Sequence, residues 1–200
     1  IRDNPRLTNV YIGQLIHLTY LSLSGNQLKS IDLTQAVRLE ELHLSRNQLT
    51  SINVKPLKQL KHVHLQENNL TSIINVTALT GLESLKLHSN SFNSSVPDTF
   101  SKLIHLSCLS MRSSHLKGNL PWIGELRNLE LLDLRNNTFE GKLSLKQLLK
   151  LKYLGLGGSG IDMNTSEVQS MLPHLKYHGD HYRHESFTPE MSHSYNTWCI

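Results

Sequence analysis

The stretch Leu18-Thr-Tyr-Leu21-Ser-Leu23-Ser-Gly-Asn26-Gln-Leu28 contains the pattern that decides the fold of this 200-residue chain. Written as L-x-x-L-x-L-x-x-N-x-L, the pattern recurs six more times, with another apolar residue at some leucine positions and Ser at two asparagine positions. The copies begin at Leu18, Leu39, Leu60, Leu82, Leu106, Leu129 and Leu151, so successive copies are 21 to 24 residues apart. A regular period of this length predicts a solenoid in which each copy forms one turn.

The L-x-L centre of each copy alternates between apolar and polar residues, as a half-buried strand does. In the first copy, Leu21 and Leu23 point into the core, and Tyr20 and Ser22 point outward. Strands of successive turns stack into a parallel sheet with a spacing of about 4.8 Å. One turn is too small to bury its own leucines, so each turn is stable only against its neighbours.

The ninth position of the pattern is polar although it lies where the chain leaves the strand. An asparagine amide there can donate to and accept from backbone groups of adjacent turns, which would otherwise be buried without partners. The sequence therefore predicts a ladder of structural asparagines formed by Asn26, Asn47, Asn68, Asn90 and Asn137.

From residue 18 to 161 the chain resembles the leucine-rich-repeat family. After the first three copies come short returns such as Leu28-Lys-Ser-Ile31, which are similar to compact repeats of bacterial surface proteins. Later returns, such as Leu116-Lys-Gly118-Asn-Leu120-Pro121, are similar to the plant-type extracellular repeat. The resemblance implies an α/β solenoid, the leucine-rich-repeat horseshoe, with a parallel β-sheet on the concave face and short 3₁₀ or extended segments on the convex face.

The pattern also suggests three segments. Residues 1–17 form a partial N-terminal repeat or cap, residues 18–174 form seven repeats, and residues 175–200 form a C-terminal cap or tail. The tail contains enough apolar material to close the end of the stack, including Tyr177, Tyr182 and Trp198. An end of a solenoid needs such closure because no further turn covers its core.

Composition and motifs exclude several classes of protein. With 38% hydrophobic and 18% charged residues the chain is not a disordered tail. It has no transmembrane helix or signal peptide, so membrane insertion by this segment is not expected. Two cysteines, Cys108 and Cys199, are too few for a disulfide framework. No catalytic motif, P-loop or zinc spacing is present, so we expect no enzyme activity, cofactor or metal.

The outward strand positions should line up as columns on the concave face, which predicts the ligand-binding surface. Its candidates are Tyr20, Glu41, His43, His62, His64, Lys86, His88, Arg112, Asp133, Arg135 and Tyr153. Acidic residues balance much of the positive charge, so a nucleic-acid groove is not expected. The expected partner is a protein or peptide ligand, which long concave surfaces of this architecture accommodate.

The histidines of this surface suggest two more specific hypotheses. His43 and His64 share a column, and His62 lies two residues from His64. Three nearby imidazoles could hold zinc or nickel, but surface histidine clusters commonly carry no metal, and none is predicted here. The alternative is a ligand interaction whose affinity changes between about pH 5 and 7, because imidazole titrates in that range.

Location and function are predicted together. Possible glycosylation sequons occur at Asn69, Asn75, Asn93, Asn136 and Asn164. These sequons and the plant-type repeats favour an extracellular or cell-surface, receptor-like recognition module. The alternative is a cytoplasmic scaffold or regulatory subunit similar to short-repeat phosphatase regulators.

Overall fold

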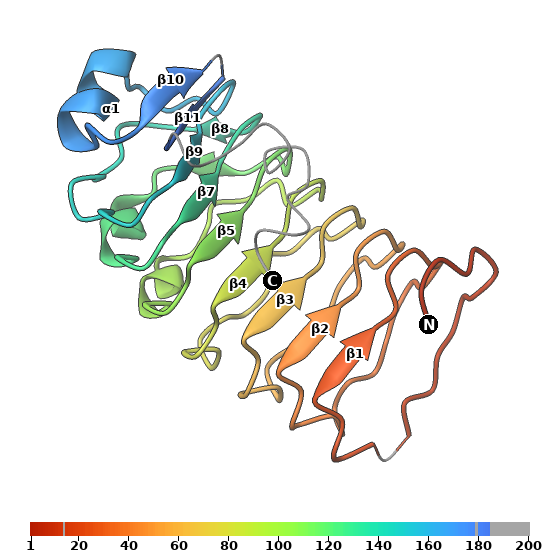
Figure 1. Cartoon of the computed structure of the whole chain (residues 1–200). Coiled ribbons are helices and arrows are strands. Elements are labelled where there is room, and N and C mark those ends of the chain that lie inside the picture. Colours follow the sequence, from red (N-terminus) through yellow and green to blue (C-terminus); the bar gives the residue numbers. More distant parts are fainter. Residues whose placement is uncertain (14, 179, 185–200) are drawn as a thin grey trace.

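A computed structural model describes residues 1–13, 15–178 and 180–184 of the chain. Seven parallel strands lie side by side along one face of an elongated stack (Figure 1). They are β1 (Tyr20–Ser22), β2 (Glu41–His43), β3 (His62–His64), β4 (Ser84–Lys86), β5 (Cys108–Ser110), β7 (Leu131–Asp133) and β9 (Tyr153–Gly155). One strand from each turn makes the predicted parallel sheet, and the solenoid fold is confirmed.

The register of the sheet matches the predicted columns. Leu21, Leu42 and Val63 pair across β1, β2 and β3, and the same position continues through β9. Leu42 and Val63 have no exposed surface, and the remaining motif leucines form one continuous core. The core is continuous because each turn buries its apolar residues against the next one.

Short segments cover the convex side, as predicted. Two are 3₁₀ helices, η1 (Asp98–Lys102) and η2 (Pro121–Glu125), and both belong to the plant-type turns. The same turns form a small second parallel sheet from β6 (Lys117–Gly118) and β8 (Thr138–Phe139), which the sequence pattern had not suggested. No helix in the described part of the chain is long and apolar enough to cross a membrane.

The end of the stack near β9 contains three elements of a different kind. Helix α1 (Thr165–Met171) begins at Asn164, whose side chain and that of Glu167 form a reciprocal capping box. The hairpin of β10 (Lys176–His178) and β11 (His181–Arg183) then joins the sheet, with β11 antiparallel to β9. Residues 185–200 of the predicted C-terminal cap lie outside the described residues.

At the other end, the N-terminal residues extend the sheet without forming a named strand. The amino group of Ile1 donates to the carbonyl of Ser22 at 3.1 Å, and the Asp3 amide donates to the carbonyl of Ser24 at 2.9 Å. The carbonyl of Ile1 and the amide of Asn4 both bond to the Asn26 side chain. These contacts satisfy backbone groups at the edge of β1.

The structure shows the asparagine side chains bridging adjacent turns. In the third turn, Asn68 accepts from the Leu49 amide at 3.0 Å and donates to the Leu44 and Leu65 carbonyls at 2.9 and 3.0 Å. Asn47, Asn90 and Asn137 make the equivalent bonds to their own and the preceding turn. Each amide therefore satisfies three backbone groups that water cannot reach.

The residue before each ladder position has a left-handed backbone in all seven turns. The φ angles lie between 52° and 73° at Gly25, Arg46, Glu67, Ser89, Ser113, Asn136 and Gly158. Only two of these residues are glycine, so the other five accept a conformation that costs about 1 kcal/mol or more. The cost recurs because this left-handed residue turns the chain so that the next residue, at the ladder position, can form its hydrogen bonds.

Replacing Ser89, one of these residues, with glycine tests the backbone cost. Ser89→Gly is expected to match or exceed the native stability, since glycine accepts its φ of 57°. Ser91→Gly, at an exposed position two residues later without a left-handed backbone, should lose about 1 kcal/mol through the greater entropy of its unfolded chain. Urea unfolding measures both variants. If Ser89→Gly is less stable than Ser91→Gly, the left-handed backbone at residue 89 does not destabilise the native protein.

Candidate functional site: a pocket on the concave face

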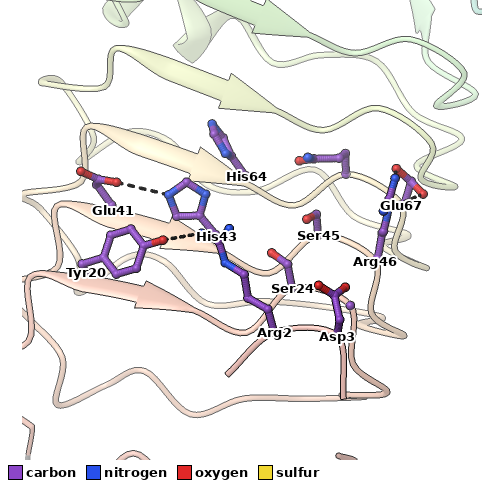
Figure 2. Close-up of a pocket in the computed structure, with 12 residues that line it drawn as sticks. Arg2, Asp3, Tyr20, Ser24, Glu41, His43, Ser45, Arg46, His64 and Glu67 are labelled. Carbon is purple, nitrogen blue, oxygen red and sulfur yellow. Dashed lines mark hydrogen bonds and ion pairs between the residues drawn. The ribbon is translucent and has the colours of Figure 1, made fainter. Parts of the chain in front are cut away.

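A pocket of about 390 Å³ lies on the concave face over β1, β2 and β3, and we call it the concave pocket (Figure 2). It is lined by Arg2, Asp3, Tyr20, Ser24, Gly25, Glu41, His43, Ser45, Arg46, His64, Gln66 and Glu67. Most of these are outward strand residues or the residues just after a strand. The pocket therefore forms because equivalent positions of three turns lie side by side.

The imidazole ring of His43 contacts two other rings, and the three form one wall of the concave pocket. The His43 ring packs edge-on against His64 with 4.5 Å between centroids, and Tyr20 lies 5.3 Å from His43 on the other side. His43 Nε2 donates to the Glu41 carboxylate at 3.3 Å. Burial lowers the pKa of His43, although the hydrogen bond to Glu41 opposes that shift. The ring is therefore neutral near pH 7.

An ion pair forms the opposite rim of the pocket. Arg46 Nε lies 3.2 Å from Glu67 Oε2, and both side chains are largely exposed. An exposed pair of this kind contributes about 0–1 kcal/mol to stability. Its two side chains can therefore exchange partners with a ligand at little cost.

The N-terminal segment supplies two pocket residues that the sequence analysis did not identify. Arg2 Nε donates to Ser22 Oγ at 2.6 Å, and its Nη2 donates to the Tyr20 hydroxyl at 2.5 Å. Asp3 lies over Gly25, where a Cβ atom would meet Asp3 Oδ1 at 2.1 Å. Both residues lie outside the repeat pattern, so no periodic signal marks them.

The predicted surface does not stay accessible along the whole concave face. Lys86, Asp133 and Tyr153 are each 1% exposed or less. Asp133 accepts two hydrogen bonds from the Arg135 guanidinium, at 2.9 and 2.7 Å. Arg135 also lies over the Tyr153 ring, and His181 of β11 stacks on that ring with 5.4 Å between centroids. The hairpin at the end of the sheet thus buries part of the predicted ligand surface.

Burial also changes the ionisation of the central residues. The pKa of His88 is lowered to about 4, first by burial and then by the positive charge of Arg112. The pKa of Lys86 is lowered to about 8 by burial alone. Desolvation destabilises the charged form of both side chains. The central concave face is therefore a packed polar core rather than an open surface.

The structure does not assemble the three imidazoles into a metal site. Among the described residues, no group of three or more His, Cys, Asp or Glu side chains is arranged to hold a metal ion. His64 bonds to Ser84 at 3.2 Å, and His62 does not line the concave pocket. Buried His62 Nδ1 has no hydrogen-bond partner among the residues described here.

The five sequon asparagines, Asn69, Asn75, Asn93, Asn136 and Asn164, are all exposed. The side chain of Asn75 accepts hydrogen bonds from both the amide and the hydroxyl of Thr77, its sequon threonine. Asn164 uses its side-chain oxygen to cap α1. Exposure is what a glycan needs, and glycosylation itself stays a prediction.

Two family models match the chain. The model described as Leucine Rich repeats (2 copies) matches residues 16–59, and the model described as Leucine Rich Repeat matches residues 81–103. The chain is also similar to Receptor-like protein 41 of Arabidopsis thaliana, with 40% identity over 91 residues. That alignment covers 44% of this chain and 10% of the relative. The chain thus matches about a tenth of the length of this curated relative.

Solved structures with a similar fold include plant receptors with bound partners. The LRR ectodomain of the membrane receptor kinase GASSHO1/SCHENGEN3 from Arabidopsis thaliana, in complex with CASPARIAN STRIP INTEGRITY FACTOR 2, is 32% identical with a TM-score of 0.62. The similarity covers 68% of this chain and 18% of that chain. The plant peptide hormone receptor RGFR1, in complex with RGF2, is 28% identical with a TM-score of 0.60, covering 75% and 25%.

Proposed function

Because the chain is a leucine-rich-repeat protein, we propose that it is a non-enzymatic recognition module that binds a protein or peptide ligand in its concave pocket. The observation that carries this proposal is the pocket itself, which spans three turns and combines an exposed aromatic ring, imidazoles and the Arg46–Glu67 ion pair. Tyr20 lines this pocket, is 44% exposed, and offers both an apolar ring and a hydroxyl. Such amphipathic groups are typical anchors of protein ligands.

The lining of the pocket, rather than its size, favours part of a peptide over a small metabolite. A volume of about 390 Å³ is within the range of small-molecule pockets, but those are lined mainly by apolar side chains, and this pocket is lined mainly by polar and charged ones. The remaining ligand residues would lie along the concave face toward the exposed Arg46–Glu67 rim. Receptors with a similar fold have been solved with bound partners, which supports the same mode of binding for this chain.

The non-enzymatic part of the proposal rests on the surroundings of the histidines. His43 donates to a carboxylate, Glu41, rather than to a hydroxyl that it could activate. The His64–Ser84 and His88–Ser110 pairs do join an imidazole to a hydroxyl. Ser84 and Ser110 are 1% and 3% exposed, so a substrate would not reach either hydroxyl.

The similarity to a receptor-like protein also supports an extracellular or cell-surface location. Exposed sequon asparagines fit that location, because glycans are added to secreted chains at such sites. We therefore propose that the ligand is met outside the cell.

Filling the concave pocket should abolish ligand capture. Ser45→Trp places a large ring in the pocket, and Ser51→Trp places the same ring at an exposed site outside the strand of the same turn. Native and Ser51→Trp baits are expected to retain the same partner from the source organism's extracellular fraction, and Ser45→Trp to lose it. Kd for the purified partner should rise at least about tenfold in Ser45→Trp.

Equal capture by all three baits would place the binding surface elsewhere and end the assignment to the concave pocket. Capture from the cytosolic fraction alone would end the extracellular assignment and leave the pocket in place.

A further inference from the structure

Most charged groups of the concave pocket already have partners within the protein. Glu41 accepts from His43, and Glu67 pairs with Arg46. Arg2 donates to two neutral hydroxyl groups. Asp3 also lines the pocket, and its carboxylate has no hydrogen-bond or ion-pair partner within the described part of the chain.

The surroundings of Asp3 are polar and open. Asp3 occupies the same end of the pocket as Ser24 and Ser45 (Figure 2). The hydroxyls of these serines come from equivalent positions of two adjacent turns. Gly25 leaves the space into which Asp3 Oδ1 descends, because any Cβ atom there would lie 2.1 Å from that oxygen. The backbone hydrogen bond from Asp3 to Ser24 thus positions this exposed carboxylate at one end of the pocket.

The charge balance of the pocket points in the same direction. Apart from its two histidines, the lining contains two guanidinium groups and three carboxylates. An anionic ligand group would have to approach this carboxylate excess. A cationic group would complete the pairing that Asp3 lacks.

We propose that Asp3 is the counter-ion for a primary ammonium group of the ligand, with Ser24 and Ser45 accepting its remaining N–H bonds. An ammonium has three donors and no acceptor, which matches one carboxylate and two hydroxyl oxygens. A lysine side chain and a peptide amino terminus both supply this group. The inference rests on the proposed function, since it assigns the chemistry of a ligand group in the same pocket.

Short peptides provide the probes. Ac-Ala-Lys-Ala-NH₂ presents the ammonium on a side chain, and H-Ala-Ala-Ala-NH₂ presents it at the amino terminus. Ac-Ala-Nle-Ala-NH₂ has the same side-chain length without charge, and Ac-Ala-Glu-Ala-NH₂ has the opposite charge. Each is titrated into the ¹⁵N-labelled chain while the amide signals of Ser24, Gly25 and Ser45 are followed.

At least one ammonium peptide is expected to shift these signals, and the norleucine and glutamate peptides are not. Whichever ammonium peptide binds identifies the source of the group. Asp3→Asn should weaken binding about tenfold, which is the usual effect of losing a charge-assisted hydrogen bond. Glu140→Gln, an exposed carboxylate away from the pocket, should leave the affinity unchanged.

Three results would overturn the inference: no binding by either ammonium peptide, equal binding by the norleucine peptide, or unchanged affinity in Asp3→Asn. Comparing Ser45→Trp with Asp3→Asn distinguishes failure of the Asp3 inference from failure of the proposed function. If Ser45→Trp abolishes peptide binding and Asp3→Asn does not, the pocket binds peptides without Asp3 as counter-ion. If neither variant changes binding, the peptide occupies another surface and both proposals fall.

Discussion

Asn68→Ala is expected to lower the free energy of unfolding by about 3 kcal/mol, because one substitution leaves three buried backbone groups without partners. The Asn68 side chain is 6% exposed and bonds to the Leu49 amide and to the Leu44 and Leu65 carbonyls. Alanine cannot replace any of these bonds. Urea unfolding followed by far-UV circular dichroism measures the loss.

The adjacent asparagine provides the control for this prediction. Asn69 is exposed, and its side chain makes no hydrogen bond to the described residues. Asn69→Ala should therefore change the unfolding free energy by less than about 0.5 kcal/mol. Equal stability of the two variants would show that the ladder does not stabilise the stack.

Asn68→Asp separates the two halves of the interaction. A carboxylate still accepts from the Leu49 amide, but it places an oxygen against the Leu44 and Leu65 carbonyls. We expect this variant to be at least as unstable as Asn68→Ala near pH 7. A stability close to native would mean that the donated bonds contribute little.

Acidification from pH 7 to pH 4 is expected to cost the native chain about 3 kcal/mol of stability through His88 alone. Burial lowers the pKa of His88 from 6.5 to about 4 in the folded protein. Between these two pKa values the unfolded chain binds the proton and the folded chain does not. Stability therefore rises with pH across this window and is lost as the pH falls. A difference of about 2.5 pKa units corresponds to about 3 kcal/mol.

The contribution of His88 is isolated by comparing variants rather than by one pH profile. His88→Gln removes the titration and keeps a group that can bond to the Ser110 hydroxyl. The native advantage over His88→Gln should shrink by about 3 kcal/mol between pH 7 and pH 4. His17→Gln, at an exposed histidine, serves as the matched control and should parallel the native profile. A constant gap between native and His88→Gln would contradict the lowered pKa of His88.

The central concave face shows why a list of outward residues does not define a binding surface. The sequence places Lys86, Asp133 and Tyr153 in the correct columns, and the sheet register agrees. Their accessibility depends on what packs across them. For Tyr153 this is a side chain of β11, which runs antiparallel to the repeats and follows no repeat pattern.

The sequence alone determined the parallel sheet, its register and the identity of the ladder asparagines. It could do so because each turn contacts mainly its neighbours, so a pattern repeated at 21 to 24 residues encodes the contacts between turns. Leu42 and Asn68 have their roles because of their position within a turn, and position can be read directly from the chain.

Only the tertiary structure decided which part of the concave face forms a pocket. The concave pocket depends on Arg2 and Asp3, which reach across about twenty residues to β1 and obey no period. The hairpin at the other end decides the burial of Tyr153 in the same way. The repeat period encodes only how one turn packs on the next, so segments outside the repeat pattern make contacts that the period does not encode.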